Sequence, residues 1–135
     1  MGYRKLQIYT LSFELFLKTH RESLRLPKYE IYELGSQLRR SSQSIVANIM
    51  EGYGRSRYKQ EFIRFLVFSH ASNNETLCHL NGIIQLYPDI NESFQALYKE
   101  YDILGAKINK YIQYVETNWN DPKTNNKDKP ARADL

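Results

Sequence analysis

Apolar side chains recur at intervals of three and four residues along four stretches of the chain, which is the period of an amphipathic helix. The stretches cover residues 3–24, 31–54, 56–87 and 91–119. Pro27 and Pro88 follow the first and third stretches and end them, because proline lacks the backbone N–H that continues a helix. Gly52 and Gly54 close the second stretch, where we expect the left-handed backbone conformation that glycine adopts readily.

The first predicted helix carries its large apolar side chains on one face, which we expect to be buried. That face comprises Leu6, Tyr9, Phe13, Phe16, Leu17 and Leu24. Four helices with one apolar stripe each must cover one another, and short connections favour antiparallel neighbours. The predicted fold is therefore all-α, an antiparallel up-down-up-down four-helix bundle. It forms one domain, residues 1–119, and residues 120–135 are predicted to be a disordered tail because they offer little to bury.

Small polar residues interrupt the stripes of the second and third predicted helices. They are Ser41, Ser44 and Asn48 on the second helix and Ser69, Ser72 and Thr76 on the third. Small side chains let two helices approach closely, and buried hydroxyl and amide groups need hydrogen-bond partners. We therefore expect a polar layer between these two helices.

Composition and charge narrow the class of protein. The chain has 135 residues, of which 41% are hydrophobic and 25% charged, and no apolar run approaches the roughly 20 residues of a membrane span. The lone Cys78 cannot form an internal disulfide, and the first residues lack the features of a signal peptide. We therefore expect a cytoplasmic protein without membrane association.

The formal net charge of +4 is concentrated in one segment. Between Ser36 and Arg64 the chain has six Lys and Arg residues against two Glu residues, so the remainder is neutral on balance. A local excess of this kind attracts phosphates or an acidic protein, although a solvated helix face is the more common explanation.

The same segment carries a recognisable pattern, "SQLRRSSQSIVANIMEGYGR" followed by "KQEFIRFL". This pattern resembles the four-helix bundle family of 23S rRNA intervening-sequence proteins, also labelled S23 ribosomal proteins. The matching positions are Gln37, Leu38, Arg39, Arg40, Ser44, Ile45, Asn48, Ile49, Glu51, Gly52 and residues 61–66. Val46 stands where many members have proline, and Leu77 stands where a second glutamate is common.

The resemblance implies an antiparallel four-helix bundle that assembles as a ring-like homopentamer. Related bundles include the accessory protein of diversity-generating retroelements, which binds nucleic acid and a reverse transcriptase. Despite the ribosomal label, the resemblance implies neither an enzymatic activity nor a ribosomal subunit. A surplus of apolar side chains on the fourth predicted helix, at Tyr98, Tyr111, Ile112 and Tyr114, also suggests a surface for self-association.

The polar residues of the segment allow two interpretations. Arg40, Ser44 and Asn48 are spaced by four and share one helix face. They could form a ligand site, but we favour a structural network between helices, because a polar seam requires such partners for folding alone. The expected network comprises Arg40, Ser44, Asn48, Glu51, Glu61, Arg64 and Glu75.

The turn between the second and third predicted helices is the candidate nucleic-acid contact. Its basic side chains are long and uncommitted to a core stripe, and tyrosines beside them offer faces on which bases can stack. The candidate residues are Arg39, Tyr53, Arg55, Arg57, Tyr58 and Lys59. The alternative to an RNA- or DNA-binding protein is a scaffold whose basic rim binds an acidic protein partner.

Catalytic chemistry has little support in the sequence. The Glu-x-x-His pairs of di-iron bundles are absent, and Glu75 with His79 supplies at most two metal ligands on one face. Cys78 has no evident base beside it, and we expect a buried structural thiol. The "GYG" motif follows a helix instead of a strand, so it does not match a phosphate-binding loop. We therefore expect no enzymatic activity, no cofactor and no metal.

Overall fold

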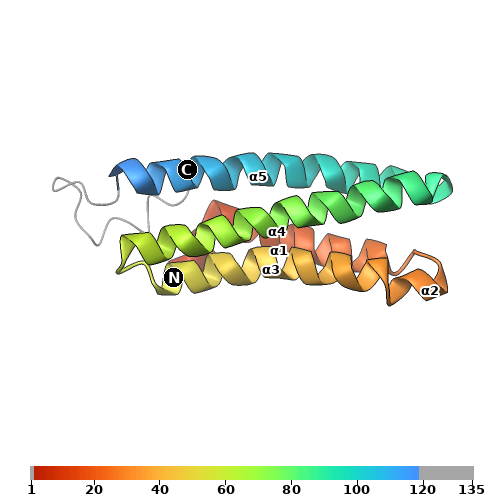
Figure 1. Cartoon of the computed structure of the whole chain (residues 1–135), viewed down its shortest axis with the longest axis horizontal. Helices are drawn as coiled ribbons and strands as arrows, with labels where there is room; N and C mark the ends of the chain where they lie inside the picture. The colour runs from red at the N-terminus through yellow and green to blue at the C-terminus, as the bar shows by residue number, and fades with distance from the viewer. Residues whose placement is uncertain (1, 119–135) are drawn as a thin grey trace.

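The computed structural model describes residues 2–118, and Figure 1 shows four long helices that alternate in direction. The elements are η1 (Gly2–Lys5), α1 (Gln7–Ser23), α2 (Lys28–Ile31), α3 (Leu34–Gly54), α4 (Lys59–Leu86), η2 (Pro88–Ile90) and α5 (Glu92–Asn118). Helix α3 packs between α1 and α4, and α5 completes the bundle against α4 and α1. The predicted antiparallel four-helix bundle is therefore confirmed. The predicted tail, residues 120–135, lies outside the described residues.

Helix α1 turns a different face to the core from the one predicted. Its buried positions are Ile8, Ser12, Leu15, Thr19 and Ser23. Phe13 and Leu17 are each 40% exposed and Leu24 is 52% exposed, so half of the predicted face was wrong, whereas Leu6 is buried as predicted. Small side chains at three of the buried positions let α1 approach its neighbours closely, and the bulky aromatic side chains are left on its outer flank.

Small polar residues join α3 and α4 as the sequence predicts. The Thr76 hydroxyl donates to Ser41 Oγ at 2.8 Å, and the Ser44 and Ser72 hydroxyls are 2.8 Å apart. Ser69 donates from α4 to the backbone carbonyl of Ile45 at 2.8 Å. These bonds satisfy polar groups that would otherwise be costly to bury.

Gly52 lies inside α3, where the sequence suggested a left-handed helix end. Among the described residues the only positive φ belongs to Gly2, so the predicted conformation of Gly52 and Gly54 was wrong. Gly52 is buried, and a Cβ atom there would lie 2.9 Å from Cβ of Phe65. Its role is thus to let α4 approach the backbone of α3.

The α1–α5 pair is held by one deep hydrogen bond and by leucines. The hydroxyls of Thr19 and Tyr101 are 2.7 Å apart and fully buried, and burial raises the pKa of Tyr101. From α4, the Asn73 side chain donates to the backbone carbonyl of Tyr101 at 2.9 Å. Gly105 permits this contact, because a Cβ atom there would lie 2.7 Å from Nδ2 of Asn73.

Two further findings bear on earlier expectations. Tyr111 and Ile112 are buried within the single chain, so the surplus apolar surface predicted on the fourth helix is largely used for the monomer's own core. No helix within residues 2–118 has the length and apolar character needed to cross a membrane.

Candidate functional site

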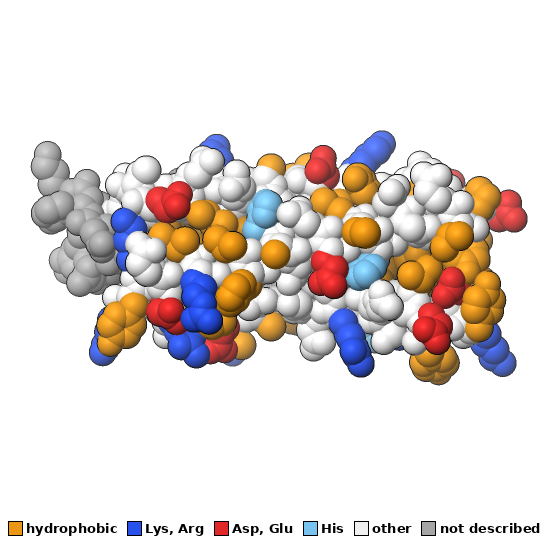
Figure 2. Space-filling model, in the orientation of Figure 1, with side chains coloured by type: hydrophobic (Ala, Val, Ile, Leu, Met, Phe, Trp, Pro, Cys, Tyr) orange, Lys and Arg blue, Asp and Glu red, His pale blue; other side chains and the backbone are white. Residues whose placement is uncertain are grey.

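Charge is unevenly distributed between the two ends of the bundle. One end, which we call the basic end, comprises residues 2–10, 48–66 and 107–118, where η1, the α3–α4 turn and the last turns of α5 meet. It carries eight Lys and Arg residues against three Glu residues. The opposite end, residues 17–40 and 75–103, carries seven Lys and Arg residues against eight Asp and Glu residues. In Figure 2 several lysine and arginine side chains are visible on the left of the view, where the basic end lies.

Two arginines of the basic end are already paired with carboxylates. Arg55 lies 3.2 Å from Glu51 and 3.7 Å from Glu61, and Arg64 lies 3.3 Å from Glu61. Both guanidinium groups also stack over the Phe65 ring, at 4.9 and 5.5 Å from its centroid. Exposed pairs of this kind contribute about 0–1 kcal/mol each, so their main effect is to fix the side chains and neutralise part of the charge.

The α3–α4 turn presents a smaller free surface than the sequence suggested. Tyr58 is 61% exposed and Arg57 is exposed beside it. Lys59 instead donates from Nζ to the backbone carbonyl of Glu116 at 2.9 Å, which places a cation at the carboxyl-terminal turn of α5. Arg57 and Tyr58 are therefore the predicted contact residues that remain accessible without breaking a bond.

Arg39 and Tyr53 do not lie on that free surface. Arg39 points toward α1 and α2, where it donates to Ser23 Oγ at 2.7 Å and to the Ile31 carbonyl at 2.9 Å. Tyr53 is half-buried and packs edge-on against Phe62, and burial raises its pKa. The guanidinium group of Arg39 therefore joins helices, and its contact with nucleic acid stays a prediction.

The predicted polar network is divided into separate groups. Asn48 donates to the carbonyl and to the hydroxyl of Ser44, within its own helix, and Ser44 meets Ser72 of α4. The second group is the chain of pairs that links Glu51, Arg55, Glu61 and Arg64. Glu75 belongs to neither group and lies 3.8 Å from His79. Arg40 is exposed and joins none of these groups among the described residues.

Helix α5 contributes basic-end residues that sequence reasoning missed. Lys107, Lys110 and Tyr114 border a shallow depression of about 440 Å³ on its outer surface. The Tyr114 ring stacks on Tyr111 at a centroid distance of 6.0 Å. The spacing of these lysines, each with a tyrosine four residues after it, was visible in the sequence. Their nearness to the α3–α4 turn was not, because it depends on how the chain folds.

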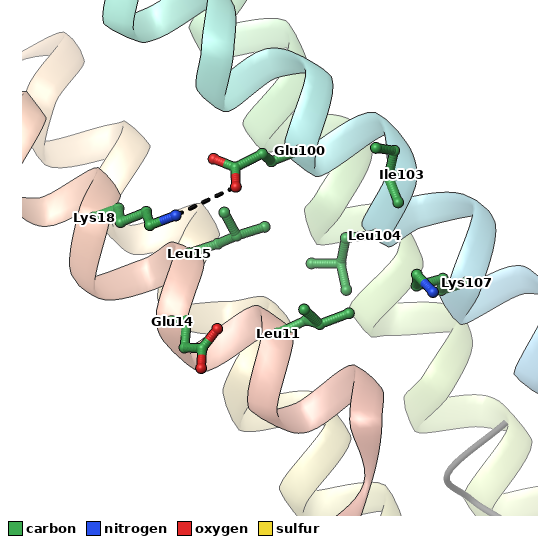
Figure 3. A pocket seen from close by; sticks show the side chains of 8 residues that line it. All are labelled: Leu11, Glu14, Leu15, Lys18, Glu100, Ile103, Leu104 and Lys107. Atoms are coloured by element: carbon green, nitrogen blue, oxygen red, sulfur yellow. Dashed lines mark hydrogen bonds and ion pairs between the residues drawn. The ribbon is translucent and has the colours of Figure 1, made fainter.

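A groove between α1 and α5 is the other concave feature that we describe (Figure 3). Its volume is about 150 Å³, and its floor is formed by leucines from both helices. A Lys18–Glu100 pair at 3.3 Å crosses it, and Ile103 beside it is 58% exposed. The groove is smaller than typical ligand pockets, which span roughly 300–1,000 Å³, and no nucleophile with an adjacent base lines it.

Glu75 and His79, the pair considered for metal binding, lie 3.8 Å apart. Within residues 2–118 no group of three or more His, Cys, Asp or Glu side chains converges to hold a metal ion. Cys78 is exposed on α4, so the expectation of a buried thiol was wrong. The helical position of Cys78 points away from the buried stripe of Asn73, Thr76 and Leu80.

One comparison with known proteins identifies a family, and its match includes the segment from Gln37 to Leu66 that carries the pattern described from the sequence. The profile of the family described as 23S rRNA-intervening sequence protein matches residues 4–110, which include all of α1, α3 and α4 and much of α5. A comparison with curated individual proteins found no match. The chain therefore belongs to the 23S rRNA-intervening sequence protein family.

Proposed function

We propose that the protein is a non-enzymatic, homo-oligomeric bundle that binds single-stranded nucleic acid, in particular RNA, at its basic end. The observation that carries this proposal is the separation of charge between the two ends, with eight cations against three carboxylates at the basic end. Phosphates are attracted to such an end over distances of about a Debye length, roughly 8–10 Å at moderate salt.

The contact residues follow from which side chains are accessible. Arg57 and Tyr58 project from the α3–α4 turn, and Lys107, Lys110 and Tyr114 border the depression on α5. The cations would bind phosphates, and tyrosine rings would stack on unpaired bases. Bases inside a duplex are already stacked on one another, which favours a single strand as ligand.

Self-association would strengthen such binding. The family resemblance implies a homopentamer, and each additional copy adds another basic end to the same particle. Several weak contacts on one strand raise the effective concentration of each further contact. A single strand that reaches across copies would therefore bind more tightly than the charge of one chain suggests.

Salt-dependent titration of single-stranded RNA tests the proposal. Replacing Arg57, Lys107 and Lys110 by alanine should weaken binding and reduce the slope of log K against log salt by about two units, since each phosphate contact on a single strand contributes about 0.7. The matched control replaces Lys28, Arg40 and Lys99, three exposed cations at the opposite end. Equal losses in both triple variants, or no loss in the first, would contradict a site at the basic end.

An acidic protein is the second candidate partner. Arg55 and Arg64 lie over phenylalanine rings, and Phe68 beside them is 41% exposed, a mixture of arginine and aromatic side chains that is common at protein interfaces. Purification of the native complex from its own cell, with sequencing of bound RNA and identification of bound protein, separates the two candidates.

A further inference from the structure

An aromatic surface runs along the outside of α1. The rings of Tyr9, Phe13, Phe16 and His20 follow one another with centroid distances of 6.0, 6.3 and 6.4 Å. Phe13 is 40% exposed, as is Leu17 next to it. We call these five residues the α1 face. Residues at other positions of α1 border α5, so the α1 face is on the flank turned away from α5.

A second exposed aromatic surface lies on α4. The rings of Phe65 and Phe68 meet edge to face at 5.5 Å, and the Arg64 guanidinium group lies over both. Two turns beyond Phe68, the side chain of Glu75 is 61% exposed and lies 3.8 Å from His79. We call Arg64, Phe65, Phe68 and Glu75 the α4 face.

The two faces lie on different sides of the molecule. Helix α4 covers the near side in Figure 1 and α1 lies behind it, and the two helices are not neighbours in the bundle. One chain therefore cannot use one face to cover the other. A symmetric dimer that pairs two α1 faces would leave both α4 faces exposed, and a dimer that pairs two α4 faces would leave both α1 faces exposed. Contact between the α1 face of one copy and the α4 face of another covers one face of each kind.

The faces are also matched in spacing and charge. Phe13 and His20 are seven residues apart on α1, and Phe68 and Glu75 are seven residues apart on α4. Parallel helices with Phe13 on Phe68 would thus bring His20, with Arg21 next to it, beside Glu75. The guanidinium cation of Arg21, at the edge of the α1 face, then lies near the exposed carboxylate of the α4 face.

Both faces lie at the same level along the bundle. Lys18 of α1 pairs with Glu100, and the next residue, Tyr101, accepts the hydrogen bond from Asn73 of α4. Lys18 and Asn73 are therefore at similar heights. Phe13 precedes Lys18 by five residues, and Phe68 precedes Asn73 by five residues. Because α1 and α4 run in the same direction, Phe13 and Phe68 are at similar heights as well.

We infer that a second copy of this chain docks its α4 face on the α1 face, with the two bundles side by side, parallel and without a shift along their length. This inference rests on the proposed homo-oligomer and specifies its contact. Each copy keeps one unlike face free for the next copy, so the contact can repeat. Parallel alignment places every basic end on the same side of the assembly, where a nucleic-acid strand could reach several of them.

Mixing of two single-face variants tests the contact. Phe13→Glu places a charge in the α1 face, and Phe68→Glu places a charge in the α4 face. Both phenylalanines are about 40% exposed, so we expect each variant to fold. Each variant alone should be a 16.0 kDa monomer in light scattering at concentrations where the parent is larger. An equimolar mixture should give a heterodimer of about twice that mass, since one intact face of each kind remains. Ile103→Glu, at an exposed apolar site outside both faces, is the control and should keep the parent's mass.

The outcomes separate this inference from the broader proposal. A parent that stays monomeric across micromolar concentrations contradicts the homo-oligomer and this contact together. A parent that assembles while both variants keep its mass contradicts only this contact. Variants that are monomeric alone and in mixture contradict the pairing of unlike faces. Circular dichroism checks folding. Leu17→Glu on the α1 face, and Ala71→Arg at an exposed position of α4 between Phe68 and Glu75, replace any variant that fails to fold.

Discussion

The contact between α3 and α4 and the contact between α1 and α5, which we call the α3–α4 seam and the α1–α5 seam, are made by different kinds of side chain. In the first, a buried glycine and hydroxyl groups let the backbones approach, and the bonds between Ser41 and Thr76, Ser44 and Ser72, and Ser69 and the Ile45 carbonyl are all made by serine or threonine hydroxyls. In the second, leucines and one Thr19–Tyr101 bond hold the helices, and a groove remains open beside the Lys18–Glu100 pair. Added side-chain volume should therefore destabilise the α3–α4 seam, because its helices are in close contact. Substitutions at the exposed edge of the α1–α5 seam should have little effect on the free energy of unfolding.

The largest effect is expected from Gly52→Val. The added side chain would meet Phe65, whose Cβ lies 2.9 Å from the position of a new Cβ, and overpacking of this kind costs about 1–3 kcal/mol or more. Urea unfolding measures the loss. Gly54→Ala is the control, because nothing lies within 4 Å of a Cβ there. If both variants are equally stable, the α3–α4 seam does not depend on close approach.

Thr76→Val should cost about 1–2 kcal/mol in the free energy of unfolding. Valine has nearly the shape of threonine but cannot donate to Ser41 or to the Ser72 carbonyl, so the buried Ser41 oxygen loses its donor and keeps only its own bond to the Leu38 carbonyl. Thermal unfolding followed by circular dichroism gives the change. Thr117→Val, on the exposed side of α5, should change stability by less than about 0.5 kcal/mol. Similar values for the two variants would mean that the buried Thr76 hydroxyl does not stabilise the α3–α4 seam.

Tyr101→Phe should cost about 1 kcal/mol at neutral pH, because it removes the buried bond to Thr19. Burial raises the pKa of Tyr101 above its ordinary value of about 10. The contribution of this group to stability is therefore fully present below pH 10 and is lost as the pH rises beyond it, by at most about 1.4 kcal/mol per pH unit.

The parent should accordingly lose stability more steeply above pH 10 than Tyr101→Phe does. Unfolding in urea at pH 9, 10 and 11 measures the two slopes. Tyr32→Phe, which removes a hydroxyl from a ring that is 78% exposed, should follow the parent. Parallel slopes for the parent and Tyr101→Phe would contradict a buried, protonated tyrosine in the α1–α5 seam.

Lys18→Met should have the smallest effect, below about 0.5 kcal/mol. The Lys18–Glu100 pair is half exposed, and such pairs contribute little to stability in water. Calorimetry at low and high salt should give nearly the same difference from the parent. A loss above about 1 kcal/mol would mean that this pair, and not the leucines beneath it, holds the groove together.

The sequence predicts the bundle and the polar layer because both depend on local spacing. Helix period and proline positions give the long helices, and small residues at matching depth give the contact of Ser41 with Thr76. The buried face of α1 could not be obtained in this way. Tyr9, Phe13 and Phe16 have the same helical spacing as Ile8, Ser12 and Leu15, and only the shape of the neighbouring helices decides which set is buried.

The candidate site was predictable in part for a similar reason. The sequence reveals an excess of cations near the α3–α4 turn, but not which of them are committed to other groups. Arg39 turns inward to Ser23, and Lys59 reaches a carbonyl of α5 that is 57 residues away along the chain. Lys107 and Lys110 lie at the basic end only because α5 runs antiparallel to α4, so that its last turns lie near the α3–α4 turn.

The α1–α5 seam is also the one that joins the helices farthest apart in the chain. Lys18 and Glu100 are separated by 82 residues, whereas α1 packs on α3, and α3 and α4 pack on the helix that follows them. Closing so long a loop costs more chain entropy than forming a contact between consecutive helices. We therefore expect this seam to form late during folding. In native-state hydrogen exchange, the amides of α1 should exchange through openings of lower free energy than those of α3 and α4.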